Sequence, residues 1–214
     1  MAWRGAHLRL RLKVDDRMTA QAGDTTQLTR ALRRQLRSQR ARISAPARLR
    51  AAQRATAVLV RTRIWRQARH VGIYLASGSE LPTTPLIDAA LRAGKLLYVP
   101  RIGAAGTMRY VAWTPGAGMR RNRHGIAEPR LTRARPWRGL DLMIVPLVGF
   151  DRSGYRLGAG GGYYDRLLAR RCIAHPPCLG WALAQQLIPA VPRDPWDRPV
   201  DGTVTERGLV WRTG

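Results

Sequence analysis

The segment Val145-Pro-Leu-Val-Gly-Phe-Asp-Arg-Ser-Gly-Tyr-Arg-Leu-Gly-Ala-Gly-Gly-Gly-Tyr-Tyr-Asp-Arg166 joins an apolar run to a glycine-rich loop and then to a helix start. The apolar run, from Leu142 to Val148, has the length and the branched residues that are typical of a buried strand. Glycines crowd residues 154–162, and Tyr163-Tyr164-Asp165-Arg166 opens a helical pattern. The segment therefore predicts a strand, a loop and a helix in immediate succession.

Such a loop is suited to binding an anion, because glycines let the backbone approach a ligand and adopt positive φ. Unpaired N–H groups and the helix dipole then favour phosphate. Arg156 and Arg166 flank the loop and can add charge-assisted hydrogen bonds. The loop is not a P-loop, because it lacks Gly-Lys-Ser/Thr, and Tyr163 stands where the dinucleotide fingerprint needs a third glycine. On the glycines alone, a mobile surface turn is the alternative.

Two helices are predicted ahead of this segment, over residues 28–43 and 44–65. Ser44 is a suitable N-cap for the second, with Pro46 tolerated in its first turn. The first predicted helix has an apolar face, and arginines occupy the rest of its surface. They are Arg30, Arg33, Arg34, Arg37 and Arg40, and we expect most of them to be solvated.

A strand–helix–strand unit follows. Val71 to Ala76 and Leu96 to Pro100 are predicted strands, joined by a helix that Thr84-Pro85 caps and that stops at Gly94. This unit predicts parallel neighbours with a right-handed crossover. The loop over residues 77–85 lies at a strand's carboxyl end, where open α/β sheets bind ligands. Further strands are expected over residues 108–113, 178–183 and 202–206.

These elements predict an α/β protein: a single three-layer α/β/α domain with a Rossmann-like open, mostly parallel sheet. The chain of 214 residues is long enough for one such domain with a buried core. We expect residues 1–27 to be a flexible N-terminal extension, since they show no lasting periodicity, and residues 28–214 to form the domain.

The charge of the chain is unusual. Its formal net charge is +25, and only Lys13 and Lys95 are lysines, so arginine supplies nearly all of the basic residues. Basic chains often bind nucleic acid. Here the arginines are scattered through every predicted helix, which indicates a compositional bias, so no specific nucleic-acid partner is expected.

Cys172 and Cys178 flank His175, but a closed zinc site needs four ligands and no second cluster exists. A disulfide between the two cysteines stays open. No apolar run approaches the ~20 residues of a membrane span, and the basic start lacks a signal-peptide core. We expect a cytoplasmic protein with no membrane partner, acting as a monomer.

The string from Arg156 to Arg166, placed after Gly149-Phe-Asp151, closely resembles the signature of the 5-formyltetrahydrofolate cyclo-ligase family, also called methenyltetrahydrofolate synthetases. Four further stretches resemble the family in the same order along the chain. They are Leu32-Arg33 with the basic helix ending at Ser44, Gly78-x-Glu80-Leu-x-Thr-x-Pro85, Gly125-Ile-x-Glu-Pro129, and Asp197-x-Pro-x-Asp201-x-x-Val-Thr. The resemblance covers nearly all of the predicted domain.

The resemblance implies ATP-dependent cyclisation of 5-formyltetrahydrofolate, with or without a polyglutamate tail, to 5,10-methenyltetrahydrofolate. ATP phosphorylates the formyl oxygen, folate N10 attacks the activated carbon, and ADP and phosphate are released. Such a transfer depends on positioning and charge neutralisation more than on a covalent nucleophile. Mg²⁺ is the implied metal, a hard cation that prefers oxygen ligands.

The resemblance also implies roles for particular residues. Arg156, Tyr164 and Asp165 would be catalytic, and Asp165 with Asp197 would hold Mg²⁺. Leu75, Glu80 and Tyr164 would bind the folate. The ATP-binding residues would be Arg30, Arg33, Arg156, Leu157, Gly158, Ala159, Gly160, Gly161, Gly162, Tyr163 and Tyr164.

Simpler roles compete with these. Glu80 and His124 are alternatively plain loop residues, Asp197 a turn residue, Tyr163 a core residue, and Asp165 a helix cap. The sequence also departs from the family. Thr29-Arg30 stands where members usually carry a lysine, and Ala159 and Gly161 replace charged or bulky residues of some members. Two other functions stay open, a non-catalytic folate- or nucleotide-binding protein on the same scaffold and an arginine-rich RNA-binding protein.

Overall fold

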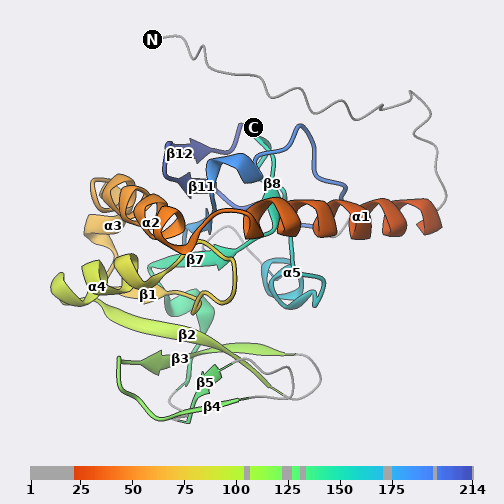
Figure 1. Ribbon diagram of the computed structural model, residues 1–214. Coiled ribbons are helices and arrows are strands. Elements are labelled where there is room, and N and C mark those ends of the chain that lie inside the picture. Colours follow the sequence, from red (N-terminus) through yellow and green to blue (C-terminus); the bar gives the residue numbers. More distant parts are fainter. Residues whose placement is uncertain are drawn as a thin grey trace.

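The computed structural model describes residues 22–103, 107–121, 127–130, 134–170, 175–194 and 197–213 (Figure 1). His124, Cys172 and most of the predicted extension over residues 1–27 lie outside these ranges. The main sheet contains eight strands. They are β1 (His70–Gly72), β2 (Leu96–Ile102), β3 (Met108–Trp113), β6 (Ala134–Arg135), β7 (Leu142–Pro146), β10 (Cys178–Trp181), β11 (Gly202–Thr205) and β12 (Gly208–Trp211).

The strands of this sheet lie in the order β12-β11-β10-β7-β1-β2-β3-β6. The five neighbours from β11 to β2 are parallel, and the strands at both edges are antiparallel. The predicted open, mostly parallel sheet is therefore confirmed. Two small antiparallel pairs stand apart from it, and they are β4 (Met119–Arg121) with β5 (Ala127–Pro129) and β8 (Gly149–Phe150) with β9 (Arg156–Leu157).

The helices are α1 (Ala22–Ala41), α2 (Ala45–Val60), α3 (Arg63–Gln67), α4 (Thr84–Arg92) and α5 (Tyr163–Leu168). Ser44 caps α2 as predicted, since its Oγ accepts a hydrogen bond from Ala47 N at 3.4 Å. The predicted cap of α4 was wrong by one residue. The N-cap is Thr83, and its Oγ1 accepts from Ala76 N at 3.1 Å instead of capping the helix, so it braces the turn after β1.

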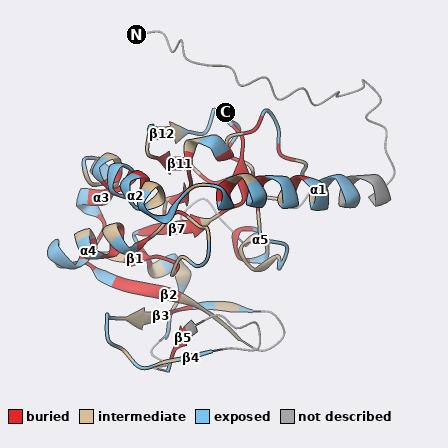
Figure 2. Cartoon of the chain, viewed as in Figure 1, coloured by how far each residue is buried: buried red, intermediate tan, exposed pale blue. Residues whose placement is uncertain are grey.

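Side chains alternate between two faces of the sheet, and each face has its own core. In β7, Leu142 and Ile144 pack under α2 and α4. Met143 and Val145 point to the other face, where Leu167 and Leu168 of α5 cover them. Figure 2 shows the buried strands between the half-exposed helices. The predicted three-layer arrangement is thus confirmed. The layer that contains α5 is thinner than the layer that contains α2 and α4.

The connections from β1 and β7 meet at one edge of the sheet. β1 pairs with β2 on one side and with β7 on the other, so the chain runs outward in both directions from this point. Ligands of open α/β sheets bind outside the carboxyl ends of strands at such a switch point. β1 ends at Gly72, four residues earlier than predicted, because the chain leaves the sheet to form the turn over residues 77–80. The loop after β7 carries the glycines.

No helix within the described ranges combines the length and the apolar character needed to cross a membrane.

Candidate active site

Two cavities lie on either side of the glycine-rich loop, with volumes of about 330 Å³ and about 220 Å³. The larger one, named here the polar cavity, is lined by Thr29, Arg33, Arg156, Leu157, Gly158, Gly162, Asp165, Arg166, Ala169, Pro192, Arg193, Asp194 and Asp197. The smaller one, the apolar cavity, is lined mainly by carbon surface. Four residues line both cavities, and they are Arg156, Gly158, Gly162 and Asp165. The loop is therefore a shared wall between two compartments.

Arg156 and Asp165 form the polar centre of this wall. Arg156 Nη2 donates to Asp165 Oδ1 at 2.8 Å, and the side chains are 2% and 31% exposed. Arg156 Nε is buried and has no hydrogen-bond partner among the residues that the structure describes. A buried guanidinium N–H without a partner is unfavourable, so this atom is a ready donor for a ligand anion.

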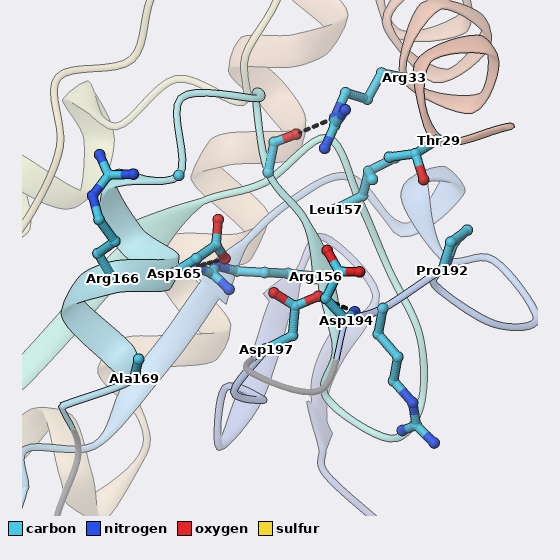
Figure 3. Close-up of a pocket in the computed structure, with 13 residues that line it drawn as sticks. Thr29, Arg33, Arg156, Leu157, Asp165, Arg166, Ala169, Pro192, Asp194 and Asp197 are labelled. Atoms are coloured by element: carbon cyan, nitrogen blue, oxygen red, sulfur yellow. Dashed lines mark hydrogen bonds and ion pairs between the residues drawn. The ribbon is translucent and has the colours of Figure 1, made fainter. Parts of the chain in front are cut away.

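Asp197 approaches the same centre from the opposite side of the polar cavity (Figure 3). Burial raises the pKa of Asp197, a hydrogen bond from Asp194 N at 2.9 Å opposes that change, and the negative charges of Asp165 and Asp194 raise the pKa further. The described part of the chain contains no group of three His, Cys, Asp or Glu side chains placed to hold a metal ion. Mg²⁺ usually takes only one or two carboxylates and completes its shell with phosphates and water.

The glycine-rich loop turns into α5 through left-handed backbone at Gly162, whose φ is 64°. A side chain at this conformation is strained, so the position favours glycine. Gly162 is the N-cap and offers no side chain to cap α5. Asp165 lies in the first turn, but its carboxylate binds Arg156 across the loop.

Helix α1 lies against the glycine-rich loop and hydrogen-bonds to its carbonyl groups. Arg33 Nε donates to Gly158 O at 2.9 Å, and Arg37 Nη2 donates to Ala159 O at 2.8 Å. Leu32 and Leu36 dock the helix onto an apolar cluster beside the loop. The close fit depends on Gly149, since a Cβ there would lie 2.7 Å from a Leu36 methyl.

The structure separates the residues that were predicted to bind ATP. Arg33, Arg156, Leu157, Gly158 and Gly162 line the polar cavity together with the predicted metal ligands Asp165 and Asp197. Ala159, Gly161, Tyr163 and Tyr164 line only the apolar cavity. Arg30 and Gly160 are exposed and line neither cavity.

The apolar cavity contains all three residues predicted for folate, Leu75, Glu80 and Tyr164. Glu80 Oε2 accepts from Ser77 N at 2.9 Å. Burial raises the pKa of Glu80, while the Ser77 hydrogen bond and the charges of Arg40 and Arg37 lower it. A carboxylate can accept several hydrogen bonds, which suits a ligand that presents N–H donors.

The aromatic side chains of the loop face the same cavity. The hydroxyl of Tyr164 is buried, and the neighbouring hydroxyl of Tyr110 interacts with it. Burial raises the pKa of this phenol, so it stays neutral and able to donate. Tyr163 lies under the guanidinium of Arg166, which is 5.0 Å from its ring centroid. Tyr163 is half-buried at the cavity wall and not part of the core.

Three residues were missed from the sequence. Glu128, 1% exposed, lines the apolar cavity and accepts from Ile102 N at 2.8 Å. It belongs to the Gly125-Ile-x-Glu-Pro129 stretch, so a signal was present but no role was drawn from it. Arg37 and Arg40 were expected to be solvated with the other arginines of α1. Arg37 is exposed as expected, although it also bonds to the loop, but for Arg40 the expectation was wrong. Arg37 binds the loop, and Arg40 is 7% exposed.

Comparison with known proteins gives a consistent result. The model of the 5-formyltetrahydrofolate cyclo-ligase family matches residues 25–206. The 5-formyltetrahydrofolate cyclo-ligase of Escherichia coli (strain K12) is 38% identical over 148 residues, covering 67% of this chain and 81% of that protein. The Haemophilus influenzae 5-formyltetrahydrofolate cyclo-ligase is 31% identical over 179 residues, covering 82% and 96%.

A solved structure agrees with these matches. The NMR structure of Aquifex aeolicus 5,10-methenyltetrahydrofolate synthetase superimposes with a TM-score of 0.76 and is 31% identical, covering 87% of this chain and 94% of that one. The family model spans the glycine-rich loop, both cavities and nearly all of the main sheet. This chain belongs to the 5-formyltetrahydrofolate cyclo-ligase family.

Proposed function

We propose that this protein uses ATP to close the ring of 5-formyltetrahydrofolate, giving 5,10-methenyltetrahydrofolate, ADP and phosphate. The observation that carries the proposal is the shared wall. A charged cavity suited to phosphates and an apolar cavity suited to a flat heterocycle meet at Arg156 and Asp165. A reaction that joins a phosphoryl group to a folate oxygen needs its two substrates to meet at such a boundary.

ATP would lie with its phosphates in the polar cavity. Arg33 and Arg156 line this space, and within the described part of the chain Arg156 Nε meets no acceptor. The loop adds backbone N–H groups near Gly158 and Gly162, where glycines keep the approach open. Together these donors would bind the triphosphate and stabilise the charge that develops on the transferred phosphoryl group.

The folate would lie in the apolar cavity. Leu75 offers apolar contact, and Tyr164 offers an aromatic ring that carries a buried hydroxyl. The Glu80 carboxylate would accept hydrogen bonds from N–H groups of the pterin. This arrangement would turn the N5-formyl group toward Arg156 in the shared wall.

The proposed reaction proceeds in two displacements. The formyl oxygen forms a bond to the γ-phosphorus as the bond from that phosphorus to the β-phosphate oxygen breaks, and ADP leaves. N10 then attacks the formyl carbon, the carbon–oxygen bond breaks, phosphate leaves, and N10 gives up its proton. The chain's own contribution is orientation and charge stabilisation, since no covalent nucleophile is required.

Asp165 and Asp197 would hold Mg²⁺, which would neutralise charge on the ATP phosphates when bound. The fit is supported by the raised pKa of Asp197, which burial and the neighbouring charges of Asp165 and Asp194 produce. Carboxylates crowded in this way gain from a cation between them. The monomeric state and the cytoplasmic location stay predictions.

The test is a direct assay. Protein, MgATP and 5-formyltetrahydrofolate are mixed, and the near-ultraviolet absorbance of the methenyl product is followed, with ADP measured in parallel. Equal amounts of both products are expected, and neither should form when ATP is omitted. Binding of both ligands without either product would instead favour the non-catalytic binding protein. Arg33 and Arg37 of the basic helix α1 donate to carbonyls of the glycine-rich loop, which supports a role at the site. Sequence-selective RNA binding that survives physiological salt would instead favour the RNA-binding alternative.

A further inference from the structure

Arg40 is a buried arginine that the proposed reaction does not use. It lies near the end of α1 and is 7% exposed. Its Nε donates to Ser79 Oγ at 3.2 Å, and its Nη1 donates to Leu147 O at 3.4 Å. Burying a guanidinium is unfavourable unless it is paired or hydrogen-bonded. The burial of Arg40 therefore indicates that its hydrogen bonds have a specific role.

The partners of Arg40 belong to the two connections that meet at the switch point. Ser79 lies in the turn after β1, one residue before Glu80, and Leu147 follows β7 directly. Arg40 thus ties the turn that carries Glu80 to the strand that leads into the glycine-rich loop. We propose that Arg40 is a positioning residue for folate, holding the turn over residues 77–80 so that the Glu80 carboxylate faces the apolar cavity.

Arg40 also acts on Glu80 through its charge. The two groups make no direct ion pair among the residues that the structure describes. Even so, the pKa of Glu80, which burial raises, is lowered by the charge of Arg40. Arg37 of the same helix acts in the same direction, and the hydroxyls of Tyr74 and Tyr164 lie within electrostatic range from the other sides. The cation opposes the effect of burial on this half-buried carboxylate, and so favours its ionised form, which accepts hydrogen bonds.

The placement of Arg40 on α1 links the two cavities. Arg33, Arg37 and Arg40 are spaced by four and three residues, so they lie along one face of the helix. The first two hold carbonyls of the glycine-rich loop, and the third holds the turn of the apolar cavity. One rigid helix therefore fixes the distance between the loop and Glu80.

The inference rests on the proposed folate role of the apolar cavity, and the experiment separates the two. Steady-state rates of methenyl formation are measured for the wild type, Arg40→Gln, Arg40→Lys and Ser79→Ala over a range of pH. Arg34→Gln is the matched control, because Arg34 is an exposed arginine of α1 that lines neither cavity. Absence of wild-type turnover would reject the proposed function itself.

For Arg40→Gln, the KM for 5-formyltetrahydrofolate should rise about tenfold, while the KM for ATP changes less than about twofold. The acidic limb of the folate KM profile should move to higher pH, because loss of the positive charge raises the pKa of Glu80. Arg40→Lys keeps the charge and should leave that limb in place. Ser79→Ala should raise the KM for folate without shifting the pH at which this KM begins to rise on the acidic side.

Two results would overturn the proposal. One is an unchanged folate KM in an Arg40→Gln protein that melts as the wild type does. The other is an equal rise of both KM values with an unmoved acidic limb, which would reduce Arg40 to an anchor of α1. If Arg40→Gln does not fold, Arg40→Lys and Ser79→Ala decide, since an unchanged folate KM in both would reject the role.

Discussion

Arg156 and Asp165, nine residues apart in the chain, form an ion pair of 2.8 Å across the glycine-rich loop, and both side chains line both cavities. The pair closes the loop onto the first turn of α5. The ion pair uses neither Arg156 Nε nor the second carboxylate oxygen of Asp165. A cation and a phosphate can therefore join the pair without breaking it, which makes Asp165 the sharpest target for mutation.

Asp165→Asn should fold almost normally, lose most turnover, and need more Mg²⁺ for the activity that remains. The amide oxygen can still accept from Arg156, so the loop stays closed, but the negative charge that would hold the metal is gone. Turnover is measured against Mg²⁺ concentration, and melting is followed in parallel. Asp88→Asn, at an exposed position of α4, is the matched control.

The opposite pattern would reject this role of Asp165. A variant that is clearly destabilised yet keeps wild-type turnover and Mg²⁺ dependence would make Asp165 only a structural partner of Arg156. The metal would then have to be sought at Asp197 or Asp194.

Asp197→Asn should raise the melting temperature of the ligand-free protein at neutral pH. Burial and nearby carboxylates raise the pKa of Asp197, so the folded state binds this proton more tightly than the unfolded state. The contribution of such a group to stability is present below its unfolded pKa and is lost as pH rises through the folded pKa. The gain of the variant should therefore disappear below about pH 4.

The same variant should lose affinity for the metal. MgATP should raise the melting temperature of the wild type more than that of Asp197→Asn, since a ligand stabilises only in proportion to its binding. A variant that gains no stability at neutral pH, or that responds to MgATP as fully as the wild type, would place Asp197 outside the metal site.

Gly162→Ala should impair ATP use and stability together. The left-handed backbone at this residue strains an alanine by about 1–2 kcal/mol. The added Cβ would also lie 2.7 Å from Arg166 Nη1, which displaces the side chain that donates to Gly161 O. We expect a clear rise in the KM for ATP, measured with saturating folate.

Gly116→Ala is the matched control for this prediction. Gly116 also has positive φ, at 82°, but it lies in a turn after β3, and its Cβ would meet nothing within 4 Å. Both variants should lose similar stability by denaturant unfolding, while only Gly162→Ala should change the KM for ATP. An ATP effect of equal size in both would assign the loss to general destabilisation.

The sheet could be predicted largely because its signals are local. Apolar runs, turn residues and the helix between residues 84 and 92 sufficed to predict parallel pairing of β1 with β2. The edge strand β12 was missed, because Gly208-Leu-Val-Trp211 is half-exposed and lacks a clear alternation. The end of β1 was also missed, since an apolar run does not mark where the chain leaves the sheet.

The arginines of α1 show what local signals cannot supply. Helical spacing predicts solvent exposure for Arg37, which is exposed, and it places Arg40 four residues after Leu36 on the row of Leu32 and Leu36. The spacing does not show which groups a charged side chain on that row would meet. The partners of both arginines come from segments far along the chain: Arg40 binds groups 39 and 107 residues away, and Arg37 binds a carbonyl 122 residues away. Only the packing of α1 onto the cluster beside the loop brings these groups together.

Glu80→Gln should weaken folate binding far more than ATP binding. The substitution keeps the size of the side chain and an oxygen that can accept from Ser77 N, so the turn should survive. It removes the charge, and with it the charge-assisted part of the contact to the pterin, about 1–3 kcal/mol. A rise of about 5- to 150-fold in the dissociation constant for 5-formyltetrahydrofolate corresponds to that loss.

The pH dependence of this affinity gives the decisive measurement. Burial raises the pKa of Glu80, so the wild type should lose folate affinity as pH falls through that raised value and the carboxylate gains a proton. Glu80→Gln carries no titrating group there, and its affinity should stay level over the same range. The affinity for ATP should show the same pH dependence in the wild type and in Glu80→Gln. Equal losses for the two ligands, or a parallel pH response in the variant, would move Glu80 out of the folate site.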